Sequence, residues 1–514
     1  MVAAFPLPNR RVCLTVLLAG CCLALPSPLL AGDLVEENEN HVAALNAYVD
    51  SQIALKQKDL DGLRELRQLG HASVQEVSEA QIALDRLHAR RTACTQMLEF
   101  TDDVKRTDPT HKSNELVIVD VSHLLGLPDA SFSPLVVSLS SESRSMLDEL
   151  RELDEQSRHA ESNVVGVRLG HANEMLNRLQ QLVSPMRGEL AEIERLTLQI
   201  QQLKAEQHLI ASTPAVVRVI DDARYQLGDQ SLSVTQLATV MEHRWQACRL
   251  TAESTAVATE LAAAMRHHER LKALETAGKS LVGELERSAS RLRRLESVAR
   301  TIEEEIAQLE SESIDTLIAR TNGTNLDDDV LIEATMIRGD AARQNDATLE
   351  ASRHRLEQVA QLAETDSFFD GELDWLSQKV RLREASAKLA ARRSRQLSHI
   401  AQSSWSGKTR FVSMQQNANS SLLTSLIELP STASAQVEYA TVALEIADER
   451  LRGLEQLRRE GHASWREVQL AKVDVDVCNA ELEARNAEQA AERVRGRLFE
   501  RIVDTHPAVH DTLR

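Results

Sequence analysis

Aromatic residues, glycine and proline are scarce in this chain. Aromatic side chains make up 3% of the 514 residues, which include 18 glycines and 11 prolines. Alanine, leucine, glutamate, arginine and glutamine dominate instead, and these are strong helix formers. The composition therefore favours long helices that pack along narrow hydrophobic seams, and it argues against a compact enzyme domain.

Cysteine is also rare. Three of the six cysteines follow residue 32, namely Cys94, Cys248 and Cys478, and they are widely spaced and odd in number. This pattern excludes a fold stapled by disulfides. Cys94 and Cys478 fall at apolar positions of predicted helices, so we interpret them as small core residues, with an intermolecular bridge as the alternative.

The recognised catalytic motifs are missing. The sequence has no Gly-rich phosphate loop, no nucleophile elbow and no Cys and His set at metal-ligand spacing. His267-His268-Glu269 would place its adjacent histidines on different sides of a helix, and residues 327–329, all Asp, lack the ligand order of a calcium loop. We interpret both as solvated polar patches, and we expect neither an enzymatic activity nor a cofactor.

Positive charge is outnumbered. The chain has 59 Lys and Arg against 78 Asp and Glu, a formal net charge of −19. Loss of residues 1–32, which contain two arginines and no acidic residue, changes the net charge to −21. Such a field repels nucleic acid and anionic lipid, so we do not expect a nucleic-acid partner.

Long apolar runs are confined to the N-terminus. Arg10 and Arg11 precede an apolar stretch over residues 12–25, and small residues follow at Ala31 and Gly32. This is the order of a secretory signal, and the apolar stretch is short for a membrane span. We predict a signal peptide over residues 1–32, an exported protein that is periplasmic or secreted in a bacterial envelope, and no transmembrane span in the mature chain.

Two processing routes remain open at this leader. Leu-Ala-Gly-Cys at residues 18–21 is similar to a bacterial lipobox, in which Cys21 is acylated and anchors the protein to lipid. The alternative is ordinary cleavage near Ala31. Because the residues after Cys21 stay apolar, as they do inside a signal core, we favour ordinary cleavage.

One segment of the chain occurs twice. Residues 62–85 and 453–476 are identical at 12 of 24 positions and share the word Gly-His-Ala-Ser, which begins at Gly70 and Gly461. Glycine closes a helix in the left-handed conformation, and a Ser three residues before a Glu forms a capping box that opens the next helix. Each copy therefore predicts a helix, a tight turn and a second helix. The structural turn residues are Gly70, Ser73 and Glu76 in the first copy, and Gly461, Ser464 and Glu467 in the second. His71 and His462 lie in these turns, and we expect them to pack there or to cap helix carbonyls.

Apolar residues after each turn recur alternately three and four positions apart. The first copy reads Val77, Ala80, Leu84 and Leu87, and the second reads Val468, Ala471, Val475, Cys478 and Leu482. A mean period of 3.5 residues is the seam of a coiled coil. Each unit is therefore predicted to be an antiparallel coiled-coil hairpin.

The same frame fits three interior sites, which end at Glu189-Leu190, Glu284-Leu285 and Glu372-Leu373. We therefore predict an all-α fold of up to five long antiparallel coiled-coil hairpins joined by irregular connectors. The predicted hairpins cover residues 33–104, 135–211, 234–320, 340–403 and 434–504. The connectors cover residues 105–134, 212–233, 321–339 and 404–433, and a tail covers 505–514.

One connector contains the best strand candidate of the chain, residues 116–121. One isolated strand cannot support a sheet. This segment either pairs with residues 216–220 or is helical.

The two turns carry a resemblance to known families. Leu63-x2-Leu66-x3-Gly70-x2-Ser73-x2-Glu76-Val77-x2-Ala80, and its second copy from Leu454 to Ala471, resemble the helical hairpin of periplasmic adaptor (membrane fusion) proteins. They are also similar to a hairpin segment of TolC-like outer-membrane efflux proteins. The resemblance covers about 60 residues at each end. Adaptors carry a tip motif, Arg-x3-Leu-x6-Ser; Leu66 with Ser73 and Leu457 with Ser464 match it, while Gly62 and Gly453 stand at the Arg position.

These observations favour an exported, non-enzymatic coiled-coil scaffold or assembly protein of the cell envelope. The resemblance implies the alternative, a component of an efflux or secretion complex. An enzyme or metal-binding module is the third hypothesis, and it depends only on the histidine pair and the aspartate cluster. We expect the partners to be other proteins, either the protein itself or envelope transport components.

Overall fold

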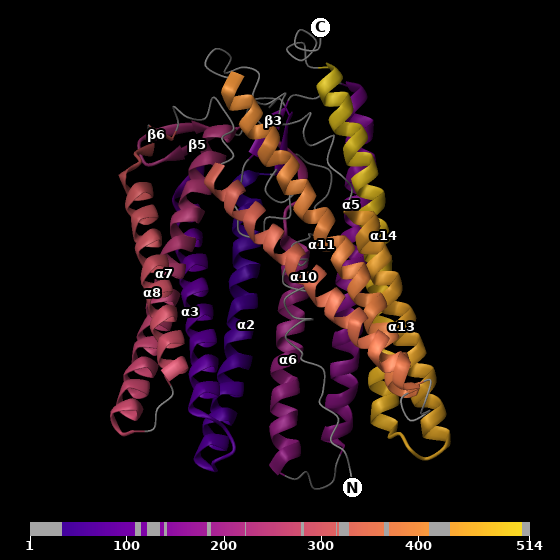
Figure 1. The fold of residues 1–514 in the computed structure, drawn as a ribbon. Coiled ribbons are helices and arrows are strands. Elements are labelled where there is room, and N and C mark those ends of the chain that lie inside the picture. The colour runs from indigo at the N-terminus through magenta and orange to yellow at the C-terminus, as the bar shows by residue number, and fades with distance from the viewer. Residues whose placement is uncertain are drawn as a thin grey trace.

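A computed structural model describes residues 33–107, 115–120, 134–137, 141–181, 187–221, 223–278, 282–314, 316–317, 328–363, 370–410 and 432–505. Long helices dominate these residues, and they are separated by short turns or by connectors (Figure 1). The predicted all-α fold is confirmed. The helices are α2 (Leu34–Gln68), α3 (Val74–Asp103), α5 (Ser141–Gln180), α6 (Arg187–Ser212), α7 (Val234–Thr276), α8 (Val282–Ser311), α10 (Asp328–Ala363), α11 (Asp370–Arg410), α13 (Ala433–Arg459) and α14 (Trp465–Thr505).

Successive helices pack against each other as five hairpins. We number them in chain order: α2 with α3, α5 with α6, α7 with α8, α10 with α11, and α13 with α14. In the first hairpin the predicted seam residues Leu84 and Cys94 are buried, and Arg91 Nε of α3 lies 2.8 Å from Asp50 Oδ1 of α2. Val468 and Ala471 are buried in the fifth hairpin. The arms therefore meet along the apolar positions that the 3.5 period selects, as in a coiled coil.

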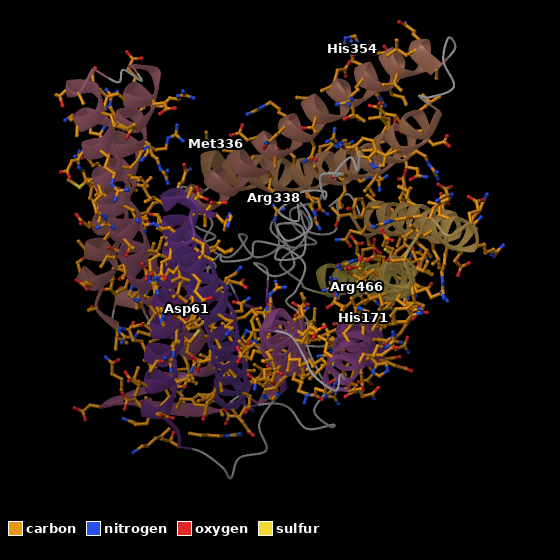
Figure 2. The ribbon with its side chains drawn as sticks, turned by 90° about the horizontal axis from the view of Figure 1, so that it is seen from below. Asp61, His171, Met336, Arg338, His354 and Arg466 are labelled. Carbon is orange, nitrogen blue, oxygen red and sulfur yellow. The ribbon has the colours of Figure 1, made fainter. Side chains whose placement is uncertain are left out.

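The hairpins lie in one row that does not follow chain order. Contacts between helices give the sequence α8, α7, α3, α2, α6, α5, α14, α13, α11, α10, so the hairpins are arranged three, one, two, five, four. Seen from below, this row bends into an open arc (Figure 2). The ends of the helices that flank all five turns point toward the lower end of the molecule in Figure 1. We call this end the tip end.

Two small antiparallel sheets lie at the opposite end (Figure 1). One has the strand order β1-β5-β6 and the other β3-β2-β4. The strands are β1 (Val104–Arg106), β2 (Glu115–Asp120), β3 (Pro134–Val137), β4 (Val217–Asp221), β5 (Arg224–Leu227) and β6 (Gln230–Ser233).

The connector over residues 212–233 is therefore not irregular, because it contributes three of these strands. Residues 116–119 of the strand candidate pair with residues 217–220 of the segment proposed as its partner, with Leu116 opposite Ile220 and Val119 opposite Val217. Val121 lies outside the described residues. A third strand, β3, pairs with the other edge of β2. Three strands can form a sheet that one strand could not support alone.

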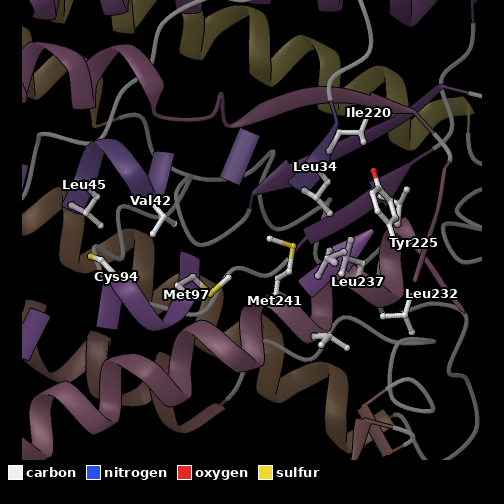
Figure 3. Close-up of a cluster of buried hydrophobic side chains, with 14 of the residues drawn as sticks. Leu34, Val42, Leu45, Cys94, Met97, Ile220, Tyr225, Leu232, Leu237 and Met241 are labelled. Atoms are coloured by element: carbon white, nitrogen blue, oxygen red, sulfur yellow. The ribbon is translucent and has the colours of Figure 1, made fainter. Parts of the chain in front are cut away.

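Among the described residues, the largest buried cluster lies where the first and third hairpins meet these strands (Figure 3). Tyr225 of β5 and Leu237 of α7 are fully buried there together with Leu34 of α2. The Tyr225 hydroxyl donates to Asp33 Oδ1 at 3.2 Å, and Asp33 in turn caps α2 by accepting from the Val35 N–H at 2.9 Å. Burial raises the pKa of the Tyr225 phenol. The main core therefore lies at the end of the molecule opposite the tip end.

The second and fifth hairpins are joined differently, through charged side chains between α5 and α14. Acidic and basic partners face each other along the two antiparallel helices. The pairs are Glu149 with Arg497 at 3.0 Å, Asp154 with Arg495 at 3.3 Å, Glu161 with Arg485 at 3.5 Å and Arg168 with Glu481 at 3.2 Å.

Candidate functional site

The first hairpin reverses through a glycine in the left-handed region. Gly70 has a φ of 80°, which costs glycine little because it has no Cβ. Its N–H donates to the Arg67 carbonyl at 3.0 Å, and the His71 N–H donates to the Leu66 carbonyl at 2.8 Å. These bonds satisfy carbonyls at the end of α2 that have no partner within the helix.

Three residues further on, Ser73 opens α3. Its Oγ accepts from the Glu76 N–H at 3.1 Å, and Glu76 Oε2 accepts from the Ser73 N–H at 2.7 Å. This is a capping box, so both ends of the turn are satisfied within a few residues. The backbone hydrogen bond from Ser73, followed by the one from its side chain, holds the pKa of the Glu76 carboxyl below its ordinary value.

The fifth hairpin repeats this geometry. Gly461 has a φ of 82°, and the His462 N–H donates to the Leu457 carbonyl at 2.7 Å. Ser464 Oγ accepts from the Glu467 N–H at 3.2 Å, and the Ser464 N–H donates to Glu467 Oε2 at 2.7 Å. The pKa of Glu467 is lowered, first by this backbone bond and then by the serine side chain. The side chains of His71 and His462 are exposed at the two turns.

The third hairpin, predicted from the frame that ends at Glu284-Leu285, closes its first helix in the same way as the first and fifth. Gly278, at the end of α7, has a φ of 75°, and its N–H donates to the Glu275 carbonyl at 2.9 Å. It lies six residues before Glu284, as Gly70 lies six residues before Glu76. The Gly-to-Glu spacing of the first copy therefore recurs here without the Gly-His-Ala-Ser word.

The second hairpin does not turn at its own Gly-His-Ala-Asn word, which begins at Gly170. That word lies inside α5, and the reversal falls between Gln180 and Arg187. Val165 and Ala172 are buried against α6, with Leu169 and Leu176 packed beside them. These four residues are spaced four, three and four positions apart and form a continuous apolar stripe. The packing of this stripe keeps α5 helical through residues 170–173.

Exposed apolar side chains are concentrated at the tip end. Of thirteen large apolar side chains that are exposed among the described residues, ten lie within five residues of a helix end that borders a hairpin turn. All five hairpins contribute. We call these ten residues the tip surface: Leu66, Leu69, Val74, Leu190, Leu274, Leu362, Trp375, Leu457, Trp465 and Leu470.

Cationic side chains pack on the two exposed tryptophans. The Arg178 guanidinium, in the last turn of α5, lies 3.8 Å from the centre of the Trp465 ring at the start of α14. Lys379 lies 4.3 Å from the centre of the Trp375 ring. Contacts of this kind contribute about 0.5–1 kcal/mol at exposed sites. The first contact also joins the tips of the second and fifth hairpins; Figure 2 labels Arg466, the residue after Trp465, near His171 of α5.

The strongest electrostatic perturbation lies between hairpins, away from the tip surface. Glu161 of α5 is buried, and burial raises the pKa of its carboxyl to about 8. Arg485 opposes this rise, but its guanidinium lies closer to Glu488, at 2.7 Å, than to Glu161, at 3.5 Å. The neighbouring Glu488 carboxylate adds to the rise. A buried carboxyl that shares its cation with a second acid favours its protonated form.

The structure describes some of the residues considered for metal binding or catalysis. His267 is exposed and His268 is half-buried on α7, and no group of three potential metal ligands occurs among the described residues. Burial raises the pKa of the Cys94 thiol to about 11, which suits a core residue and not a nucleophile. Cys21, the predicted signal peptide over residues 1–32 and Asp327 lie outside the described residues.

No family model, no curated protein and no solved structure matches this chain. Within the described part of the chain, every helix is too short of apolar residues to cross a bilayer. The fold and the tip geometry thus define the class of this protein: an arc of coiled-coil hairpins that presents its turns at one end.

Proposed function

We propose that this protein is an exported, non-enzymatic scaffold or assembly protein of the cell envelope that binds another protein through its tip surface. One observation carries the proposal: ten of the thirteen exposed large apolar side chains lie beside hairpin turns. Clustered apolar side chains on an otherwise polar surface mark a contact site. The long arms then act as spacers that hold the tips away from the core.

The N-terminal sequence supports the proposed address. Its order of basic, apolar and small residues is that of a secretory signal, so we place the protein in the periplasm or outside the cell. The acidic composition suits a protein partner better than nucleic acid or anionic lipid. The alternative to a soluble exported protein is a protein anchored to the membrane by a lipid on Cys21.

A second candidate is a component of an efflux or secretion complex. Leu66 and Leu457 occupy the Leu position of the adaptor tip motif, and their side chains are 45% and 42% exposed at the tips. An exposed apolar side chain at that position is available for a helical partner. This observation favours an adaptor-like or outer-membrane-efflux-like role over a purely mechanical spacer.

Site-specific photocrosslinking in the native envelope tests both candidates. A photoreactive residue replaces Leu69, the most exposed residue of the tip surface at 70%, and a matched control replaces Val298, which is 39% exposed on α8 away from any turn. We expect a discrete crosslinked protein from position 69 and none from position 298. An inner-membrane transporter or an outer-membrane channel as the product supports the second candidate. Equal labelling at both positions, or none at position 69, contradicts tip binding.

A further inference from the structure

The first and fifth hairpins expose apolar side chains at two equivalent positions of their tips. Leu66 and Leu457 occupy equivalent positions in the two copies of the repeat and are exposed to nearly the same extent. Val74 and Trp465, 41% and 38% exposed, are also equivalent. The two tips therefore share these two apolar positions, whereas Glu460 stands at the position of Leu69 and Glu79 at the position of Leu470.

The row of hairpins places these two tips on either side of the second hairpin. In the order three, one, two, five, four, the first and fifth hairpins flank the second at equal steps. Consider a two-fold axis through the tip of the second hairpin, perpendicular both to the row and to the long axes of the hairpins. This axis places a second copy tip to tip with the first and reverses the order of its hairpins. The first hairpin of each copy would then face the fifth hairpin of the other, which is the reciprocal contact that an isologous interface requires.

The charges of the two tips are opposite. Within eleven residues of Gly70 on either side, about three helical turns, two basic residues stand against five acidic ones, a net charge of −3. The equivalent window around Gly461 has six basic and three acidic residues, a net charge of +3. Contact between two first tips would be repulsive, whereas a first tip and a fifth tip attract each other.

We propose that the partner of the tip surface is a second copy of this chain, docked tip to tip with the first hairpin of each copy against the fifth hairpin of the other. This inference rests on the proposed function and names the partner. Apolar side chains exclude water at the contact, and the opposite charges set its register. Because charge sets the register, the dimer weakens as the salt concentration rises.

Sedimentation equilibrium of the full chain tests the pairing. We expect the mass of a dimer, which falls by half in the double variant Leu66→Glu with Leu457→Glu. The matched control, Met265→Glu with Val298→Glu, places the same two charges on exposed apolar positions away from the turns. It should remain a dimer. Circular dichroism verifies that all forms keep their helices.

Charge reversal tests the register. Chains with Arg458→Glu and Arg459→Glu, or with Glu65→Arg and Glu79→Arg, carry like charges on both tips, so each alone should be monomeric. Their mixture restores attraction at both contacts and should restore the dimer. A wild-type chain that is monomeric at every concentration overturns the inference, as does a mixture that stays monomeric. Either result leaves the crosslinking test of the proposed function independent, since a crosslinked protein other than this chain supports tip binding even when the chain is monomeric.

Discussion

Replacement of Glu161 by Gln should remove a pH dependence from the stability of this protein. Burial raises the pKa of this carboxyl to about 8, against an ordinary value of 4.5. Between these two pH values the folded chain keeps a proton that the unfolded chain releases. Stability is therefore lost as pH rises through this window, and the loss is complete above about pH 8.

The size of the effect follows from the two pKa values. The full difference between 4.5 and about 8 corresponds to roughly 5 kcal/mol, an upper limit because water entry reduces the effect of burial. Gln cannot ionise and keeps the shape of the protonated acid, and Arg485 keeps Glu488 as its partner at 2.7 Å. The variant should match the wild type near pH 5 and exceed it increasingly toward pH 8.

Urea unfolding followed by circular dichroism, repeated from pH 5 to pH 9, measures this difference. Glu149→Gln is the matched control, because Glu149 pairs with Arg497 across the same two helices while both side chains are half exposed. Exposed ion pairs contribute less than about 1 kcal/mol to the free energy of unfolding. The free energy of unfolding of this control should therefore follow that of the wild type at every pH. Should Glu161→Gln also parallel the wild type, the carboxyl does not titrate in this window and the argument from burial fails.

Three further predictions concern the turns and the leader. Gly461→Ala, at a φ of 82°, should lower the free energy of unfolding by about 1–2 kcal/mol, whereas Gly453→Ala, in the open on α13, should be neutral or stabilising; thermal melts compare the two. Ser73→Ala removes the cap of α3 and should cost about 1 kcal/mol in the same assay, with an unchanged melting temperature counting against the capping box. A palmitate analogue should not label the protein in cells, and labelling that disappears in Cys21→Ser would establish the lipid anchor instead.

The hairpins could be predicted because local rules encode them. Gly70 and Ser73 specify a turn through their own backbone and side-chain chemistry, and the 3.5 period specifies which face of each arm is buried. The strand pairing of residues 116–121 was one of two open readings, because a lone apolar run fits both a strand and a helix.

The lateral order of the hairpins could not be predicted in this way. It depends on contacts between residues far apart in the chain, such as Asp154 with Arg495 on α5 and α14. A charged residue on one helix gives no indication of its partner on another. The tip surface could not be predicted for a related reason. The sequence shows that Leu66 and Trp465 are apolar, but it does not show that they are exposed, because exposure depends on which face of each helix packs against a neighbour.

The reversal of the chain at each turn is the claim on which the whole account depends. Spin labels at positions 50 and 91 test it most directly, because Asp50 and Arg91 pair across the arms of the first hairpin at 2.8 Å. Two packed helices should hold the labels within about 20 Å of each other, allowing for the length of the labels. If α2 and α3 instead formed one continuous rod, the labels would lie about 60 Å apart, and the hairpin account would be contradicted.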